Sequence, residues 1–148
     1  VETGRKINEA RNRLGSRLDY RGAVYGEDKC AFFRDIDVLL FPSYAPYEAQ
    51  PLVVIEALTY GVPVIGSRLA CIPDIIGENG GCVLPLETFS GAAAEQLAEW
   101  AGEQTRLYRA KKRAHARAQV LRKDGQKAVS WLVNMVAGRA QPTFFRNV

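Results

Sequence analysis

Two short apolar runs with a helical segment between them occupy the middle of the chain, and this alternation restricts the fold more than any other feature. Residues 37–41 and 63–66 have the composition of strands, and residues 51–60 have that of a helix. The run at residues 37–41 is almost continuously apolar, which predicts a strand buried on both faces. Strands that alternate with helices predict an α/β fold with a parallel sheet flanked by helices.

The rest of the chain continues this alternation and then becomes helical. Residues 5–15 place Ile7, Ala10 and Leu14 on one stripe of a helix, and Gly15 can end it. We expect further strands at residues 1–4, 18–24 and 82–84, and further helices at residues 27–34, 71–76, 91–108 and 126–136. Asp124 and Gly125 predict a break before the last of these helices.

Two carboxylates, Glu48 and Glu56, bracket the start of the central helix. Glu56 is the only charged residue between Ala49 and Ser67. Burying a bare carboxylate is costly, so Glu56 must face water, a partner or a ligand. Open α/β sheets bind their ligands beyond the carboxyl ends of the strands, where strands lead into helices. The two acids are therefore located where a ligand is expected.

The start of this helix has the features of an anion site. Pro51 suits the first helical position, where its missing N–H costs nothing. Leu52 and Val53 then carry N–H groups without an acceptor in the helix, and these groups and the helix dipole favour a phosphate. Glu56 shares a face with both residues and lies roughly 7 Å along the axis from Pro51, at ~1.5 Å per residue. A phosphate between two hydroxyl acceptors is the arrangement that a nucleotide-sugar requires.

Several ordered motifs extend this pattern along the chain. They are Tyr20-Arg-Gly22, Phe41-Pro-Ser43, the pair Glu48 and Glu56, Glu56-Ala-Leu-x-x-Gly61-x-Pro63-Val-Ile, and Gly80-Gly-Cys-Val-Leu-Pro85. Within residues 1–90 they resemble the C-terminal donor-binding domain of group 1 glycosyltransferases, which are retaining enzymes of the GT-B fold. The resemblance implies a Rossmann-like sheet and a UDP- or GDP-hexose donor. It also implies transfer of the sugar to a hydroxyl acceptor in polysaccharide, lipopolysaccharide or glycolipid synthesis.

The resemblance gives each of the two acids a role. Glu56 would accept hydrogen bonds from the ribose 2′- and 3′-hydroxyls, and a solvated helix glutamate is the alternative. Glu48 would contact hydroxyls of the transferred sugar, and the alternative is a loop carboxylate that favours the helix N-terminus.

Backbone groups would complete the site that the resemblance implies. The amides expected to contact the sugar and the phosphates are those of Gln50, Leu52 and Val53. The segment expected to hold the nucleobase through its backbone is Gly22, Ala23 and Val24, and a plain turn is an equal alternative for it. Arg68 reads first as a solvated loop arginine, and His115 lies in a basic helix far from the motif.

The resemblance covers one domain of a two-domain enzyme. We expect the donor-binding domain at residues 1–112 and C-terminal helices and a tail at residues 113–148. In relatives an earlier strand supplies cations to the diphosphate, and residues 1–4 match the strand after it. We therefore expect the first strand, the N-terminal acceptor domain and the catalytic groups to lie outside this chain, which lacks an initiator Met. Such a fragment alone is expected to be inactive.

Composition favours a cytoplasmic protein. The chain begins without a signal-peptide pattern, no apolar run approaches the ~20 residues of a membrane span, and Cys30, Cys71 and Cys82 read as reduced, buried cysteines.

Between residues 106 and 123 lie eight Lys or Arg and no acid, a pattern typical of a solvated helical face. Peripheral contact with anionic lipid is the next interpretation. No aromatic interleaving supports nucleic acid, and the resemblance implies neither a metal ion nor another cofactor.

Two other classes of protein are alternatives to the enzyme. The chain could be a noncatalytic relative of the fold that acts as an assembly or regulatory module with a vestigial pocket. A flavodoxin-like or receiver domain is disfavoured, because no acidic cluster ends the first strand and no hydroxyl-rich phosphate loop follows it.

Overall fold

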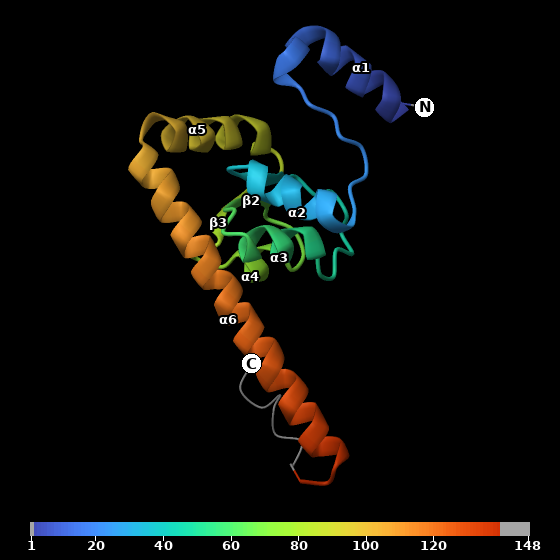
Figure 1. Ribbon diagram of the computed structural model, residues 1–148, viewed down its shortest axis with the longest axis vertical. Coiled ribbons are helices and arrows are strands. Elements are labelled where there is room, and N and C mark those ends of the chain that lie inside the picture. The colour runs from blue at the N-terminus through green and yellow to red at the C-terminus, as the bar shows by residue number, and fades with distance from the viewer. Residues whose placement is uncertain (1, 140–148) are drawn as a thin grey trace. The chain divides into compact units, whose positions relative to one another are not determined.

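The computed structural model of the protein describes residues 2–139, and Figure 1 labels their helices and strands. The chain divides into two compact units, residues 1–34 and residues 35–148. The first unit contains the helix α1 (Glu2–Leu14), the 3-10 helix η1 (Gly15–Arg17) and the helix α2 (Gly26–Asp35), which ends one residue into the second unit. Helix α2 confirms the helix expected at residues 27–34.

Helix α1 confirms the helix expected at residues 5–15, but it begins earlier than the sequence suggested. The strand expected at residues 1–4 is therefore wrong over its described part. Charged side chains at helical spacing explain the difference, because such pairs stabilise a helix by about 0.2–0.5 kcal/mol each. The exposed pairs are Lys6 Nζ–Glu2 Oε1 at 3.0 Å and Arg5 Nη1–Glu9 Oε1 at 2.6 Å.

The segment between η1 and α2 has no regular structure, so the strand expected at residues 18–24 is wrong. Gly22 has a φ of 68°, which belongs to a turn rather than to a strand. Arg21 Nε donates to Asp19 Oδ2 at 2.7 Å and ties the segment locally. A strand also needs a neighbour for its backbone groups, and the described part of this unit contains none.

The second unit is built on a parallel sheet of three strands, as the alternation of elements predicts. The strands are β1 (Leu39–Phe41), β2 (Val64–Ser67) and β3 (Gly81–Leu84), in the spatial order β1-β2-β3. Between β1 and β2, Phe41 pairs with Gly66, and between β2 and β3, Ser67 pairs with Leu84. The strands expected at residues 37–41, 63–66 and 82–84 are confirmed within a residue or two.

Strand β1 is less buried than its apolar sequence suggested. All four residues of the middle strand β2 are buried, whereas Leu40 at the centre of β1 is 43% exposed. The expectation that β1 is buried on both faces is therefore wrong. Its position explains this, because β1 is an edge strand of the sheet and only β2 has a strand on either side.

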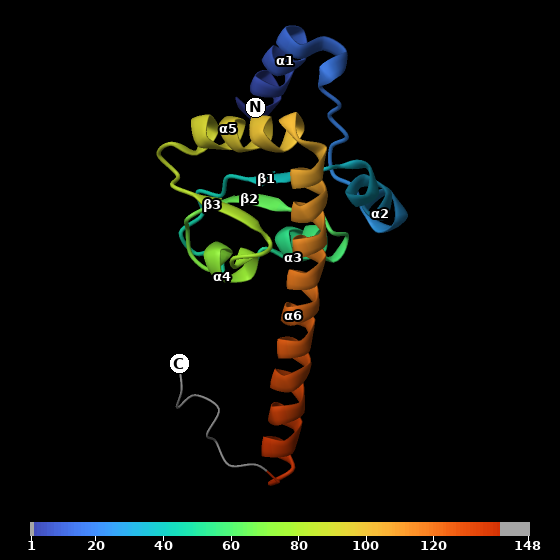
Figure 2. The same cartoon turned by 90° about the vertical axis from the view of Figure 1, so that its left-hand side faces the viewer.

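Helices cover both faces of the sheet, as Figure 2 shows. Helix α5 (Phe89–Gly102) lies on one face, and α3 (Leu52–Thr59) and α4 (Ile72–Ile76) lie on the other. Under α5, Ile65 of β2 packs with Phe89 and Ala93. On the opposite face β2 and α4 approach so closely that a Cβ at Gly66 would lie 2.6 Å from Ile76 Cδ1.

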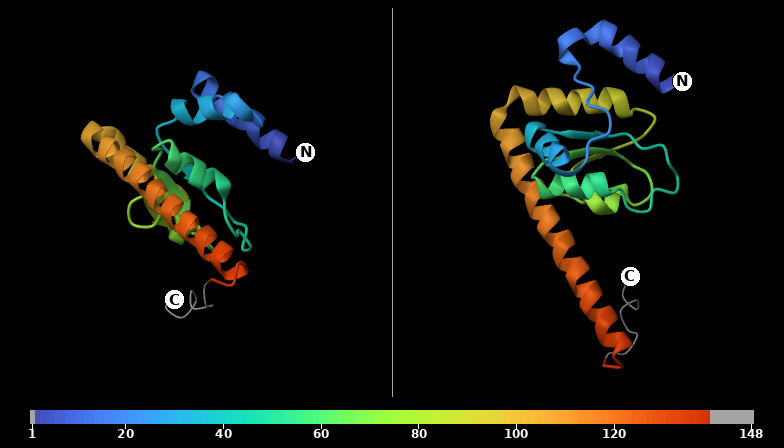
Figure 3. Two further views of the ribbon diagram at one scale, coloured as in Figure 1. Left: turned by 60° about the horizontal axis from the view of Figure 1, so that its bottom comes forward. Right: turned by 45° about the vertical axis from the view of Figure 1, so that its right-hand side comes forward.

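The C-terminal part of the unit is helical, but its boundaries differ from the expected ones. The helix expected at residues 91–108 ends at Gly102, and α6 (Gln104–Val136) begins after a single extended residue, Glu103. Helix α6 then packs against α5, α3 and β3 and continues past them (Figure 3). The expected division between residues 112 and 113 falls within α6 and stays a prediction.

Helix α6 runs without interruption through Asp124 and Gly125, so the break expected there is wrong. A single glycine in a helix costs about 1 kcal/mol relative to alanine but leaves every backbone hydrogen bond intact. Lys127 Nζ lies 3.5 Å from Asp124 Oδ1 across the same turn. The helix expected at residues 126–136 is confirmed at its C-terminal end, and the tail at residues 141–148 lies outside the described residues.

Candidate functional site

The loops that follow the three strands meet at one edge of the sheet, because all strands run in the same direction. These loops are residues 42–51 after β1, residues 68–71 after β2 and residues 85–88 after β3. Beyond the carboxyl ends of parallel strands is where open α/β sheets bind ligands. The loop of residues 42–51 leads into α3 and carries Glu48.

Helix α3 confirms the helix expected at residues 51–60, with its start shifted by one residue. Pro51 is the N-cap, with φ −69° and ψ 99°, and Leu52 is the first helical residue. The amide of Val54 donates to Pro51 O at 3.0 Å. The amides of Leu52 and Val53 precede this bond and have no acceptor within the helix. The anion cradle that the sequence predicts at this point thus consists of two N–H groups at a helix N-terminus.

Glu48 is half-buried in the loop before α3. Its amide donates to Ala45 O at 3.2 Å, and its Oε2 accepts a hydrogen bond from Ser43 Oγ at 3.4 Å. The loop therefore holds the Glu48 carboxylate by local hydrogen bonds, a few residues before the N–H groups that open α3.

Glu56 lies in the second turn of α3 and is half-buried. It follows Leu52 by four residues and Val53 by three, so the three residues share one face of the helix. The core face of α3 is formed by Val54, Ala57 and Leu58, all of them buried. Glu56 is thus outside the hydrophobic core, as its charge requires.

The structure places the candidate site residues in two groups. One loop and helix of the second unit contain Glu48, Gln50, Leu52, Val53 and Glu56. The other group, Gly22, Ala23 and Val24, belongs to the first unit, in the segment between η1 and α2. A joint role of the two groups in holding one ligand stays a prediction.

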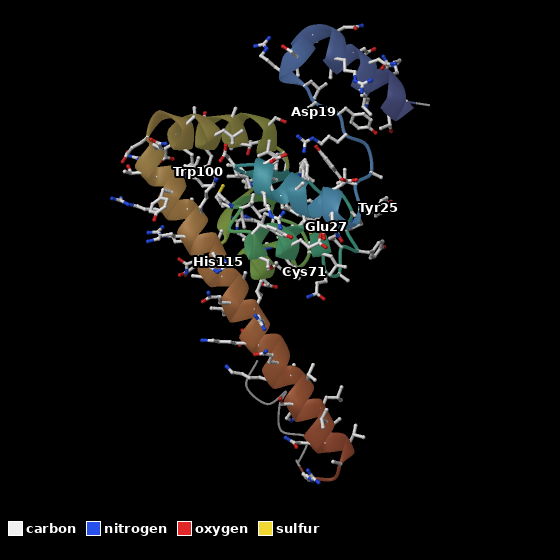
Figure 4. The ribbon with its side chains drawn as sticks, viewed as in Figure 1. Asp19, Tyr25, Glu27, Cys71, Trp100 and His115 are labelled. Atoms are coloured by element: carbon white, nitrogen blue, oxygen red, sulfur yellow. The ribbon has the colours of Figure 1, made fainter. Side chains whose placement is uncertain are left out.

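One serine and one cysteine from other segments contact the Glu48 loop, which contains a further serine, Ser43, and sequence reasoning did not single out these three residues. Ser67 Oγ donates to Ser43 O at 2.9 Å, and Cys71 Sγ lies 3.2 Å from Glu48 O and 2.6 Å from Ala49 O. Figure 4 marks Cys71. The structure brings Ser43 and Ser67 together because Phe41 of β1 pairs with Gly66 of β2, a register that the sequence alone does not reveal.

Residues that sequence reasoning weighed only lightly have other roles or lie at the surface. The Arg68 side chain is exposed, while its amide donates to Leu84 O at 2.7 Å. His115 lies on α6 (Figure 4), and its Nδ1 is 3.3 Å from the carbonyl oxygen of Thr59, the last residue of α3.

An Asp-x-Asp sequence, residues 35–37, precedes β1 and so lies at the amino end of that strand. Asp37 Oδ1 accepts a hydrogen bond from Lys111 Nζ of α6 at 2.6 Å. The Glu48 loop follows the carboxyl end of β1. The two aspartates are thus separated from the candidate site by the length of the strand.

A cleft lies at the corner of α5 and α6, beside the start of β3. Its lining residues include Gly81, Cys82, Trp100, Arg106, Arg109 and Arg113, and Trp100 is marked in Figure 4. Burial raises the pKa of the Cys82 thiol, and the Glu99 carboxylate adds to this shift. None of the candidate site residues lines this cleft.

Basic side chains of α6 serve partly to hold the helix on the sheet unit. Arg117 Nε donates to Ile75 O at 2.9 Å, and Lys111 pairs with Asp37. Arg106 pairs with Glu99 and with Glu103.

Within residues 2–139, no helix combines the length and the apolar character that crossing a bilayer requires.

Comparison with known proteins identifies the family to which the chain belongs. The sequence model of the family described as Glycosyl transferases group 1 matches residues 2–102. A 41.2 kDa protein of the cps region of Klebsiella pneumoniae is 42% identical over 60 residues, which are 40% of this chain and 16% of that protein. The O-antigen chain mannosyltransferase B of Escherichia coli is 32% identical over 63 residues, 43% of this chain and 16% of that protein.

A solved structure supports the fold. Sucrose-phosphate synthase from Thermosynechococcus elongatus superposes with a TM-score of 0.74 at 23% sequence identity, over 92% of this chain and 35% of that chain. At this identity the likeness concerns the fold alone. It confirms the expected parallel sheet flanked by helices as part of a GT-B structure. The chain matches less than a fifth of the length of the curated relatives named above.

Proposed function

The chain belongs to the group 1 glycosyltransferases, and from this premise we propose that it is the donor-binding part of a retaining hexosyltransferase. The donor would be a UDP- or GDP-linked hexose. The sugar would pass to a hydroxyl acceptor in the synthesis of a polysaccharide, a lipopolysaccharide or a glycolipid. The observation that carries the proposal is the N-terminus of α3, which opens at the carboxyl edge of the sheet between Glu48 and Glu56.

The helix start would bind the diphosphate. Two N–H groups, those of Leu52 and Val53, and the positive end of the helix dipole favour negative charge at this point. The amide of Gln50 would add a contact from the loop. When the bond to the sugar breaks, negative charge grows on the leaving diphosphate, and fixed N–H donors stabilise that charge without reorganising. This part of the protein would thus contribute positioning and electrostatic stabilisation.

The two carboxylates would bind the groups on either side of the diphosphate. Glu56 would accept hydrogen bonds from the ribose hydroxyls, and Glu48 from hydroxyls of the hexose. The backbone of Gly22, Ala23 and Val24 would contact the nucleobase. A carboxylate that accepts two hydroxyl donors selects a diol by geometry as well as by charge.

The remaining parts of the reaction are assigned to the rest of the protein. Within the chain, residues 1–112 would form the donor-binding domain, and residues 113–148 would be its C-terminal helices and tail. The chain matches only a fraction of its relatives' length. The acceptor site and the catalytic groups would come from an N-terminal acceptor domain, so residues 1–148 alone would not transfer sugar.

A cytoplasmic location follows from the nature of the donor, which is the substrate class that we assign. The basic residues of α6 that hold no partner on the sheet unit, such as Arg122 and Lys123, are exposed. They support peripheral contact with anionic lipid, where each cation near the surface contributes about 1 kcal/mol.

The Glu56→Ala variant of the full-length protein tests the proposed function. Loss of two hydrogen bonds to a charged acceptor, each worth about 1.5–3 kcal/mol, should lower the affinity for UDP or GDP about a hundredfold or more. Isothermal titration calorimetry with both nucleotides measures this. The matched control is Glu95→Ala, which removes an exposed helical carboxylate from α5 and should leave the affinity unchanged.

Two outcomes would contradict the proposal in different ways. If the Glu56→Ala variant binds the nucleotide as well as the unaltered protein does, Glu56 is not the ribose acceptor. If the unaltered protein binds neither UDP nor GDP, the donor-binding function is wrong, and the noncatalytic assembly module is the better account.

A further inference from the structure

Three side chains hold the loop that carries Glu48: one belongs to the loop itself and two come from other segments of the chain. They are Ser43 and Ser67, near the ends of β1 and β2, and Cys71, just before α4. We call these three residues the Glu48 latch. Each contact joins the latch to residues 43–49 rather than to the hydrophobic core, so the latch acts on the position of the loop.

Ser67 anchors the beginning of the loop. It is the one buried polar or charged side chain within residues 2–139, with no exposed surface. A buried hydroxyl needs a hydrogen-bond partner, and Ser67 Oγ donates to Ser43 O at 2.9 Å, 24 positions away in sequence. The end of β2 therefore fixes the backbone of Ser43.

Ser43 passes this constraint to the carboxylate. Its Oγ accepts a hydrogen bond from the amide of Ala45 at 3.3 Å and donates to Glu48 Oε2 at 3.4 Å. Among the described residues, Oε2 is the only carboxylate oxygen of Glu48 with such a partner. The second oxygen, Oε1, remains available to a hydroxyl of a ligand.

Cys71 fixes the end of the loop. Its thiol lies 3.2 Å from Glu48 O and 2.6 Å from Ala49 O, so two consecutive carbonyl groups face one sulfur. The preceding residue, Ala70, has a φ of 48° and is the only non-glycine residue with a positive φ in the described range. Such a conformation costs about 1–3 kcal/mol and persists only where surrounding contacts enforce it. This strained turn is what brings the thiol under the loop.

We propose that Ser43, Ser67 and Cys71 are positioning residues that orient the Glu48 carboxylate toward the transferred sugar. This proposal rests on the proposed function, because it assigns Glu48 to the sugar. The hydrogen bonds of the latch reach residues 43–49 and not the N–H groups of α3. We therefore expect the latch to control the affinity that the sugar adds to the nucleotide and to leave the contacts of α3 with the diphosphate and the ribose unchanged.

The test compares two ligands on each variant of the full-length protein. Calorimetry gives the affinity for a nucleoside diphosphate and for its sugar, either UDP and UDP-glucose or GDP and GDP-mannose, whichever pair the unaltered protein binds. The latch variants are Cys71→Ala and Ser43→Ala. The matched controls are Cys30→Ala in α2 and Ser90→Ala in α5, which remove the same groups from outside the latch.

The latch variants should keep the nucleoside diphosphate affinity within about twofold and lose about tenfold in affinity for the nucleotide-sugar, the effect of one hydrogen bond to a charged group. Cys71→Ser retains a donor at this position and should recover most of the loss. The controls should match the unaltered protein with both ligands.

Two results would overturn the latch. One is an unchanged ratio of the two affinities in both latch variants. The other is an equal loss for both ligands, which is the result of a purely structural role. If the unaltered protein binds none of the four ligands, the proposed function falls and the latch with it. If Glu56→Ala loses nucleotide affinity while the latch variants keep their ratio, the latch alone is wrong.

Discussion

At the scale of the residue, Pro51 decides which N–H groups the proposed anion cradle offers. Because proline has no N–H, it cannot donate to a ligand, and as the N-cap it leaves the first two donors to Leu52 and Val53. The sequence predicted this helix start to within one residue, because proline is common at the first turn. The cradle thus follows from the chemistry of a single side chain.

The latch residues could not be predicted in the same way. Cys71 read as one of three buried, reduced cysteines, and nothing in its neighbours in sequence distinguished it. Its role depends on the backbone turn at Ala70 and on a loop 22 positions earlier. Contacts between distant segments arise from the register of β1 and β2, which one sequence does not fix.

Glu103, at the corner of α5 and α6, gives a prediction on pH. The pKa of Glu103 lies below the ordinary value of 4.5. The largest cause is the hydrogen bond that Thr105 Oγ1 donates to its carboxylate at 2.6 Å, and the next is the one that Arg106 Nε donates at 2.5 Å. The charge of Arg109 lowers the pKa least. A lowered pKa in the folded state stabilises the fold above the unfolded pKa, and this contribution is lost as the pH falls through the folded pKa.

We expect Thr105→Ala to raise the pKa of Glu103 toward 4.5 and Arg109→Ala to change it less. A pH titration of the Glu103 carboxyl carbon by NMR measures both values. An equal shift in the two variants, or a larger one in Arg109→Ala, would contradict the assigned order of causes.

At the scale of the element, the sequence predicted what depends on local pattern. The apolar runs of β1, β2 and β3 and the turns between them correctly indicated a parallel sheet, and α2, α3 and α4 followed from helical spacing and proline. The error at residues 18–24 has a different origin. A strand exists only beside another strand, and the apolar content of a segment does not reveal whether a neighbour is present.

The sequence also failed to predict where the two long helices, α5 and α6, begin and end. The sequence placed a break at Asp124 and Gly125, whereas the chain bends at Glu103. At the corner, α6 turns to pack across α3 and β3. Residues 122–130 of α6 are exposed, so packing does not hold the helix at Gly125. The helix continues there because a glycine costs it only about 1 kcal/mol.

Helix continuity at Gly125 gives the next prediction. A Cβ at Gly125 meets no atom within 4 Å, so Gly125→Ala should raise the free energy of unfolding by about 0.5–1 kcal/mol. Thermal or urea denaturation followed by circular dichroism measures the change. The matched control is Gly81→Ala, whose Cβ would lie 1.9 Å from Val64 O and whose φ is 145°, so it should be strongly destabilising.

A destabilised Gly125→Ala variant would contradict the continuous helix. Alanine is more favourable than glycine inside a helix and is unfavourable only where the backbone leaves the helix with a positive φ. A Gly81→Ala variant as stable as the unaltered protein would contradict the close approach of β2 and β3.

At the scale of the whole molecule, the chain is one part of a group 1 glycosyltransferase. Its sheet, the helix α3 and the two carboxylates support the proposed binding of a donor, and the chain matches 16% of the length of each of the two curated relatives named above. The identity of the base and of the sugar depends on contacts that the sequence pattern does not contain. The proposed site of the diphosphate, by contrast, depends on backbone amides at the N-terminus of α3 and in the loop before it.

The crystal structure of the full-length protein with UDP or GDP bound is therefore the most direct measurement. The account predicts diphosphate oxygens about 2.7–3.2 Å from the backbone nitrogens of Leu52 and Val53, with the ribose hydroxyls on the Glu56 carboxylate. A diphosphate bound away from the N-terminus of α3, with Glu56 making no contact to the ribose, would contradict it.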